Sequence, residues 1–166
     1  MSFSLLPRVI VPALTDVDLQ ALKNRGIRLL MLDFDNTIVP YTTNVPTKKM
    51  SRWLEKAKTS EIQICVVSNS KRSRVVDFCK AQNIPCITHA KKPTAKGIRQ
   101  CMDRFGLKPD ACALAGDQIY TDVLGANCAG VRSILVTSID NHNIWLKLRH
   151  VLEVPFIFCA KGRTVQ

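Results

Sequence analysis

Short apolar runs alternate with amphipathic stretches along most of this chain. The runs are rich in Ile, Val and Leu, have the length of strands, and cover residues 28–34, 62–68, 85–89, 111–117 and 131–137. Several are continuous enough to be buried on both faces, which is typical of parallel strands. The pattern therefore predicts βαβ units and an α/β fold, with one five-stranded parallel sheet flanked by helices.

The stretches between these runs carry apolar residues at helical spacing. In residues 47–59 a single apolar stripe combines four side chains, namely Met50, Trp53, Leu54 and Ala57. Similar stripes predict helices over residues 70–82 and 94–105, and a shorter one over residues 120–129. No internal repeat or linker divides the chain, so its 166 residues are expected to form a single domain.

The composition favours a folded, soluble protein. With 46% hydrophobic residues the chain can bury a sizeable core, which excludes a disordered or fibrous protein. No run approaches the roughly 18 apolar residues of a membrane span, and the N-terminus has no clear signal-cleavage site, so we expect a cytoplasmic protein. The seven cysteines show no paired close spacing, which argues against a zinc module or a redox pair and predicts free thiols.

Positive charge is concentrated in the middle of the chain. The whole sequence carries a formal charge of +11, and residues 47–104 contribute 14 Lys and Arg against four acidic residues. A solvated helix face explains part of this excess, but it does not explain the shortage of carboxylates. The charge therefore predicts an anionic partner.

Acidic residues follow two of the predicted strands, at the edge where open parallel sheets bind their ligands. Asp33 and Asp35 end the first run and are expected to lie on the same side. Two carboxylates placed in this way repel each other, and a cation such as Mg²⁺ relieves that repulsion. Asp117 and Asp122 follow the fourth run, so they add carboxylates to the same predicted metal site.

Groups suited to phosphate follow the second and third runs. Ser68 and Asn69 provide a hydroxyl and backbone N–H groups where the next helix begins. Lys92 precedes Pro93 at a further helix entrance and can neutralise phosphate charge, with Lys91 as its rival. Each residue alone is also consistent with helix capping or loop chemistry, but the four strand ends together predict a phosphate site beside the metal.

Taken in chain order, these residues resemble the motifs of a known enzyme superfamily. The four motifs of the haloacid dehalogenase superfamily of phosphohydrolases are similar to Asp33-Phe34-Asp35-Asn36-Thr37-Ile38, then Ser68, then Lys92-Pro93, then Gly116-Asp117 with Asp122. This resemblance covers residues 27–137. Flanking features from Leu6-Pro7 to Trp145 resemble the YqeG-like class IIIA branch, which implies one Rossmann-like domain over residues 1–166.

The resemblance implies a catalytic role for the acids of the first and fourth motifs. Asp33 would be the nucleophile that forms an aspartyl-phosphate. Asp35 would act as general acid and then as general base. Mg²⁺ would be held by the carboxylate of Asp33, the backbone carbonyl of Asp35 and Asp117.

The resemblance also implies how the transferring phosphoryl group is bound. Ser68, Asn69 and Lys92 would contact its oxygens. Asp122 would orient Lys92 or a metal-bound water. The implied activity is that of a Mg²⁺-dependent phosphatase.

The spacing of the motifs bears on the substrate. Residues 37–68 and 68–92 each hold one crossover, so no cap domain is expected over the site. An open site favours a large or surface-bound phosphorylated partner, which means lipid, nucleic acid or protein. The YqeG-like branch is similar to the mitochondrial phosphatidylglycerophosphate phosphatases, which implies a phospholipid substrate. Nucleic-acid ends, phosphoproteins and a non-catalytic phosphate-binding module remain alternatives.

Two segments are candidates for peripheral contact with an anionic membrane. Residues 143–153 have an amphipathic pattern that includes Trp145, Lys147 and Arg149, and the N-terminal residues 3–11 are also apolar. The alternative for residues 143–153 is a late helix that packs on the sheet. The alternative for residues 3–11 is that they cover an edge of the core.

Overall fold

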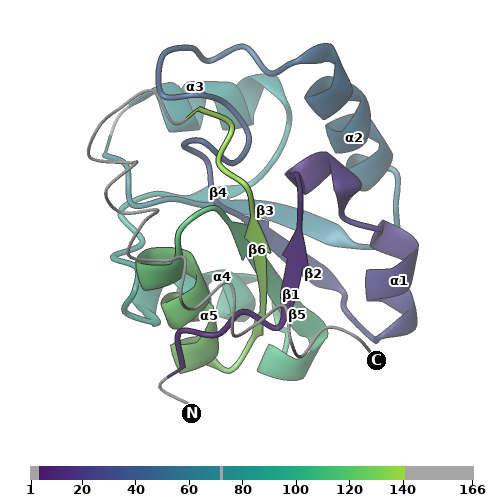
Figure 1. The fold of residues 1–166 in the computed structure, drawn as a ribbon, viewed down its shortest axis with the longest axis vertical. Coiled ribbons are helices and arrows are strands. Elements are labelled where there is room, and N and C mark those ends of the chain that lie inside the picture. Colours follow the sequence, from purple (N-terminus) through teal and green to yellow (C-terminus); the bar gives the residue numbers. More distant parts are fainter. Residues whose placement is uncertain (1–3, 72, 141–166) are drawn as a thin grey trace.

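A six-stranded parallel sheet lies at the centre of the computed structural model, which describes residues 4–71 and 73–140 (Figure 1). The strand order is β1-β6-β5-β2-β3-β4, and all paired neighbours are parallel. The strands are β1 (Val9–Val11), β2 (Leu29–Leu32), β3 (Gln63–Val67), β4 (Cys86–Ile87), β5 (Cys112–Gly116) and β6 (Arg132–Val136). Since β2 lies between β3 and β5, the residue that follows it emerges near the middle of the sheet.

Helices cover both faces of the sheet (Figure 1). They are α1 (Leu19–Asn24), α2 (Lys48–Lys58), α3 (Ser73–Ala81), α4 (Lys96–Phe105) and α5 (Leu124–Ala129). Helices α1, α2 and α3 pack on one face with Leu30 and Leu32, whereas α4 and α5 pack on the other with Leu29 and Met31. Successive strand residues therefore face opposite layers, which explains why the central strands are apolar throughout.

Most predicted elements are confirmed, with ends shifted by a few residues. The apolar stripe of α2 is buried as predicted, at Met50, Trp53, Leu54 and Ala57. The predicted helix over residues 120–129 consists of two parts, a π-helical turn η3 (Ile119–Val123) and α5. Two 3₁₀ turns, η1 (Leu14–Asp16) and η2 (Pro109–Ala111), precede α1 and β5.

The prediction of five strands is wrong by one, because residues Val9–Val11 form an additional edge strand, β1. They pair in register with the segment from Ile134 to Val136 in β6. Leu5 and Ile10 pack against a small apolar cluster, so residues 5–11 cover an edge of the core, as one of the two alternatives predicted. A strand of three half-buried residues is too short to stand out as an apolar run.

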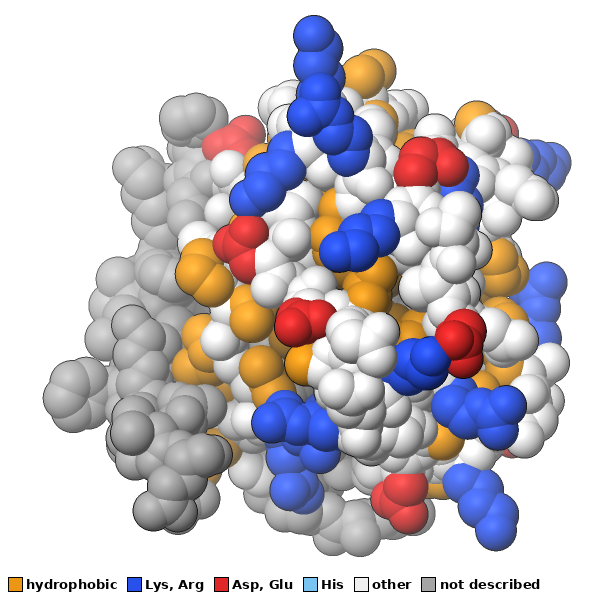
Figure 2. Space-filling model, turned by 90° about the vertical axis from the view of Figure 1, so that its right-hand side faces the viewer, with side chains coloured by type: hydrophobic (Ala, Val, Ile, Leu, Met, Phe, Trp, Pro, Cys, Tyr) orange, Lys and Arg blue, Asp and Glu red, His pale blue; other side chains and the backbone are white. Residues whose placement is uncertain are grey.

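Basic side chains are prominent on the face that carries α1 and α2, with acidic side chains scattered among them (Figure 2). On α2, Lys48, Lys49, Arg52 and Lys56 are exposed, on the side of the helix away from its buried stripe. Within residues 4–71 and 73–140, no helix is long and apolar enough to cross a membrane. The candidate membrane helix over residues 143–153 lies outside the described residues.

Candidate active site

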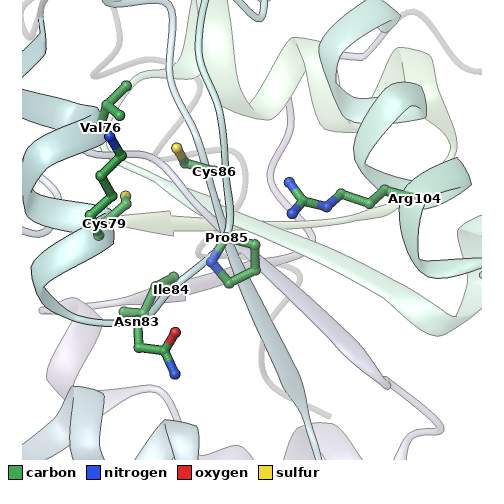
Figure 3. Close-up of a pocket in the computed structure, with 8 residues that line it drawn as sticks. Val76, Cys79, Asn83, Ile84, Pro85, Cys86 and Arg104 are labelled. Carbon is green, nitrogen blue, oxygen red and sulfur yellow. The ribbon is translucent and has the colours of Figure 1, made fainter.

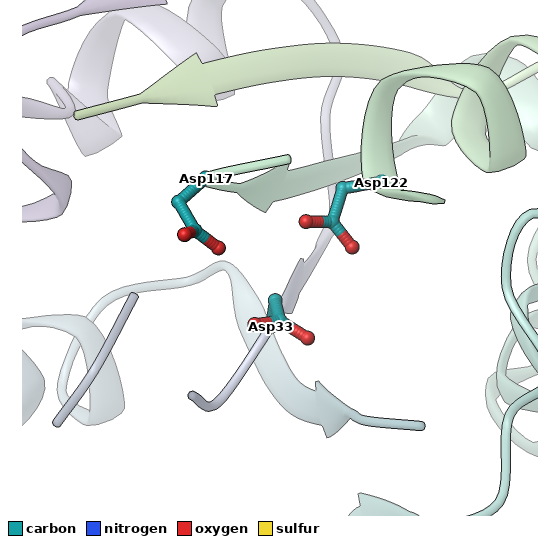
Figure 4. A group of neighbouring side chains, drawn as sticks. All are labelled: Asp33, Asp117 and Asp122. Carbon is teal, nitrogen blue, oxygen red and sulfur yellow. The ribbon is translucent and has the colours of Figure 1, made fainter. Parts of the chain in front are cut away.

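Three buried carboxylates converge at the carboxyl edge of the sheet (Figure 4). Asp33 directly follows β2, Asp117 directly follows β5, and Asp122 lies in η3. One carboxylate oxygen of each lies within 4.8 Å of the other two. Because β2 and β5 are neighbouring strands, the sheet itself brings Asp33 and Asp117 together, as the sequence predicted.

Lys92 is the cation that faces these acids. Its Nζ atom lies 2.6 Å from Asp33 Oδ1 and 2.7 Å from Asp122 Oδ1. The residue is only 5% exposed, so both ion pairs are shielded from water. Of the two lysines that the sequence offered, Lys92 therefore reaches the acids, whereas Lys91 is exposed.

The close approach of three buried acids alters the pKa values of the site. Burial raises the pKa of Asp33 to about 7, although Lys92 opposes this rise. Burial also raises the pKa of Asp117 well above its usual value, and the charges of Asp33 and Asp122 add to the effect. Burial by itself lowers the pKa of Lys92, but the attraction of Asp122 and Asp33 outweighs it and raises that pKa. A divalent cation would balance the excess negative charge.

A tight turn follows Asp33 and links it to the neighbouring strand end. The backbone N–H of Asn36 donates to the carbonyl of Val39 at 2.7 Å. Asn36 has a φ of 60°, in the left-handed region that asparagine tolerates better than most residues. The Thr37 hydroxyl donates to Asp117 Oδ1 at 3.3 Å, so the turn holds the side chain of Asp117 as well.

The predicted phosphate-binding residues Ser68 and Asn69 follow β3. Ser68 is buried, and its Oγ accepts a hydrogen bond from the backbone N–H of Ser70 at 3.1 Å. The Asn69 side chain donates to the carbonyl of Lys92 at 2.9 Å and accepts from its N–H at 2.7 Å. Asn69 therefore fixes the backbone of Lys92, and its contact with phosphate stays a prediction.

Gly116 is required by the close approach of Asp122. A Cβ atom at Gly116 would lie 2.3 Å from Asp122 Oδ2, far inside van der Waals contact. The same oxygen accepts a hydrogen bond from the N–H of Gln118 at 3.1 Å. Gly116 thus leaves room for the carboxylate of Asp122, which the N–H of Gln118 holds in place.

Arg74 is a residue of this edge that the sequence did not predict. It lies in the first turn of α3, and its Nη2 atom is 3.2 Å from Asp35 Oδ1. Arg74 precedes Phe78 by one helical turn, and Phe78 belongs to the buried stripe of α3. That spacing is the signal that could have placed the arginine beside the core rather than in solvent.

A cavity of about 450 Å³ lies apart from these residues, where α3 ends and the chain enters β4 (Figure 3). Its lining includes Cys79, Pro85, Cys86 and Arg104, and none of the predicted site residues. Cys79 and Cys86 are among the six cysteines of the described residues, all of them free thiols, as predicted. The cavity is therefore separate from the cluster at the carboxyl edge.

The fold is that of hydrolases of the haloacid dehalogenase superfamily, as comparison with solved structures shows. The cobalt-bound deoxy-D-mannose-octulosonate 8-phosphate phosphatase of Haemophilus influenzae matches the fold with a TM-score of 0.56 at 16% identity, over 76% of this chain and 77% of that one. A hydrolase of the superfamily, subfamily IA, from Geobacter sulfurreducens matches with a TM-score of 0.50 at 13% identity, over 66% of this chain and 89% of that one. At these identities the likeness concerns the fold alone.

The chain belongs to the family described as mitochondrial PGP phosphatase, whose family model matches residues 2–139. The "Probable phosphatase YqeG" of Bacillus subtilis is 34% identical over 134 residues, which cover 81% of this chain and 78% of that protein. The chloroplastic phosphatidylglycerophosphate phosphatase 1 of Chlamydomonas reinhardtii is 26% identical over 140 residues, and the match covers 79% of this chain and 52% of that relative. The predicted resemblance to YqeG-like phosphatases is confirmed.

Proposed function

We propose that this chain hydrolyses phosphomonoesters through an aspartyl-phosphate formed on Asp33. The observation that carries the proposal is the contact of 2.6 Å between Asp33 and Lys92 inside a buried acidic cluster. A phosphate dianion that approaches a carboxylate needs a cation at the point of attack, and Lys92 supplies one there.

Asp35 would move the protons in both half-reactions. In the first, a carboxylate oxygen of Asp33 attacks phosphorus, the bond to the leaving oxygen breaks, and that oxygen takes its proton from Asp35. In the second, water attacks phosphorus and gives a proton to Asp35, while the electron pair of the broken bond returns to the Asp33 carboxylate. The sum is ester plus water to alcohol plus inorganic phosphate, with both residues restored.

The donor set at this edge fits a resident Mg²⁺. The carboxylates of Asp33 and Asp117 and the backbone carbonyl of Asp35 would hold it, and Asp122 would keep Lys92 in place beside them. Oxygen donors with excess negative charge are what Mg²⁺ prefers in proteins. When bound, the ion shields the repulsion between the carboxylate and the phosphate. Ser68 and Lys92 would bind the phosphoryl oxygens.

Added Mg²⁺ is expected to raise the melting temperature more at about pH 8 than at about pH 5.5, by a difference of a few degrees. The pKa of Asp33 is raised to about 7, so protons compete with the ion below that pH and leave the site to it above. Thermal unfolding with and without Mg²⁺ at both pH values measures this. Asp117→Asn, which replaces a charged ligand with a neutral one, should reduce the difference, and a larger shift at acid pH would contradict the assignment.

The substrate class that we propose is a phospholipid monoester such as phosphatidylglycerophosphate. The description of the family and the name of the algal relative support it. The excess of Lys and Arg in residues 47–104 is consistent with an anionic lipid surface. This surface would bring the phosphate to the site without enclosing it, since the chain between β2 and α2 is a loop rather than a domain.

Apolar residues beside the site also support a lipid surface. Tyr41, Val45 and Ile139 are the large hydrophobic side chains exposed in the described part of the chain, at 41%, 72% and 42%. Tyr41 and Val45 lie in the loop that follows the Asp33 turn, and the N–H of Ile139 donates to the carbonyl of Asn36 in that turn at 2.9 Å. Exposed apolar residues with basic neighbours suit peripheral contact with an anionic bilayer.

Phosphate release from vesicles that contain phosphatidylglycerophosphate tests the proposed function. With Mg²⁺ present, the wild type is expected to release phosphate and Asp33→Asn is not. The double variant Val45→Ser/Ile139→Ser should be slower on vesicles by roughly tenfold, because it loses apolar contact with the bilayer. The same variant should hydrolyse soluble 4-nitrophenyl phosphate at the wild-type rate.

Other outcomes of this assay would favour other functions. Turnover of the soluble ester without release from vesicles would contradict the lipid substrate but not the phosphatase. Faster release from a 5′-phosphorylated oligonucleotide, with steep salt dependence, would favour nucleic-acid ends. No release from any phosphomonoester would favour a non-catalytic module that binds phosphate.

A further inference from the structure

The side chain of Arg74 connects two parts of the catalytic edge. Its Nη2 atom lies 3.2 Å from Asp35 Oδ1. The same guanidinium donates to three backbone carbonyls, at 2.7 Å to Tyr41, 3.1 Å to Pro40 and 3.2 Å to Thr43. One residue therefore holds both the aspartate that would move the protons and the loop that follows it.

The guanidinium of Arg74 also packs over an aromatic ring. Its central carbon lies 5.2 Å from the centroid of the Phe34 ring, and the Phe34 ring packs edge-on against Phe78 of the same helix at 5.2 Å. Phe34 is fully buried, and the Arg74 side chain is only 12% exposed. Packing on the buried Phe34 ring restricts the motion of the guanidinium, so it can hold the Asp35 carboxylate in one orientation. A solvated surface ion pair does not restrict its partners in this way.

We propose that Arg74 is a positioning residue that aims the Asp35 carboxylate at the oxygen of the leaving group and couples that aim to the loop of residues 40–43. The inference rests on the proposed function, because it assigns a task to the aspartate that moves the protons. Arginine suits this task since its planar fork carries five donors in fixed directions, which a lysine ammonium does not.

The chemistry of the leaving group separates this role from a purely structural one. An alkoxide or a weakly acidic phenol needs a proton as its bond to phosphorus breaks, whereas an acidic phenol leaves as a stable anion. A misaimed Asp35 therefore slows the first kind of ester and spares the second. A loop that is merely loosened slows both kinds alike.

The test compares 4-methoxyphenyl phosphate with 4-nitrophenyl phosphate, using the full chain with Mg²⁺. In Arg74→Met, kcat/KM for the methoxy ester should fall by about 100-fold, and for the nitro ester by no more than about fivefold. Arg74→Lys keeps one charged donor for Asp35. Its kcat/KM for the methoxy ester should therefore be about tenfold higher than that of Arg74→Met. Arg25→Met, at an exposed arginine that ends α1, serves as the matched control and should leave both rates unchanged.

A double variant makes the assignment to Asp35 specific. In an Asp35→Asn background the further change Arg74→Met should not alter the ratio of the two rates, because no carboxylic acid remains to be aimed. Equal losses for both esters, or no recovery by lysine, overturn the inference. If Arg74→Met does not fold, Arg74→Lys alone must show the selective loss for the methoxy ester. Inactivity of the wild type on both esters would instead contradict the proposed function, and with it the role of Arg74.

Discussion

Asp33→Asn is expected to lower the rate of phosphate release by at least about 10³-fold while the fold stays intact. The change removes the attacking oxygen but almost no volume. Because burial raises the pKa of Asp33 to about 7, its charge is costly to the folded state, and the variant should melt no lower than the wild type. Initial rates and thermal unfolding of the same preparations measure both effects.

The matched control for this change is Asp110→Asn. Asp110 is an exposed aspartate in η2 and undergoes the same chemical change far from the carboxyl edge. Its rate and its melting temperature should equal those of the wild type. If Asp33→Asn kept a rate within about tenfold of the wild type, Asp33 would not be the nucleophile.

Lys92→Met is expected to abolish turnover and to lower the free energy of unfolding by about 3–5 kcal/mol near neutral pH. Asp33 and Asp122 would lose the ammonium that lies 2.6 Å and 2.7 Å from them, so the buried acidic cluster would lose its ion-pair partner. Asp33 and Asp117 have raised pKa values in the folded state, so the folded state gains protons as the pH falls. The stability deficit should therefore shrink at about pH 5, which denaturant unfolding at two pH values can measure.

Lys91→Met provides the control because Lys91 is the exposed neighbour of Lys92. It carries the same change in charge and side chain one residue away, so its stability and its activity should stay close to those of the wild type. If Lys91→Met and Lys92→Met lost stability and activity to a similar extent, the losses would come from a disturbed segment rather than from the missing buried ammonium. If the stability deficit of Lys92→Met grew toward acid pH, the raised pKa values of the buried acids could not be its cause.

The central sheet and the acids at its edge could be predicted because their signals are local and continuous. The runs that became β2, β3 and β5 are buried on both faces, and such strands are apolar at every position or nearly so. Parallel order then brings their carboxyl ends to one edge, which predicted a shared site. The pairing of β2 with β5, which the sequence did not predict, makes Asp33 and Asp117 close neighbours. The sequence also predicted that Lys92 lies at this edge, but it did not predict the direct contact between Lys92 and Asp33.

The features that the sequence did not predict depend on partners far away in the chain. Strand β1 is defined by its pairing with β6 rather than by its own three half-buried residues. The spacing of Arg74 and Phe78 indicates only that the arginine lies near the core. Its hydrogen bonds to the carbonyls of residues 40, 41 and 43 depend on a loop far away in the chain. A pattern based on one segment cannot show a contact whose other half is a loop carbonyl.

The pairing of β1 with β6 has a consequence for the order in which the protein can be completed. Val9 pairs with Ile134, so among the described strands β1 is synthesised long before its partner β6. Until residues 132–136 have emerged, the outer edge of β5 has no neighbour on that side, and unpaired edges invite association with other chains. The pairing of β1 and β5 with β6 is therefore a late event, and an interrupted synthesis would leave strand edges exposed that can associate with other chains.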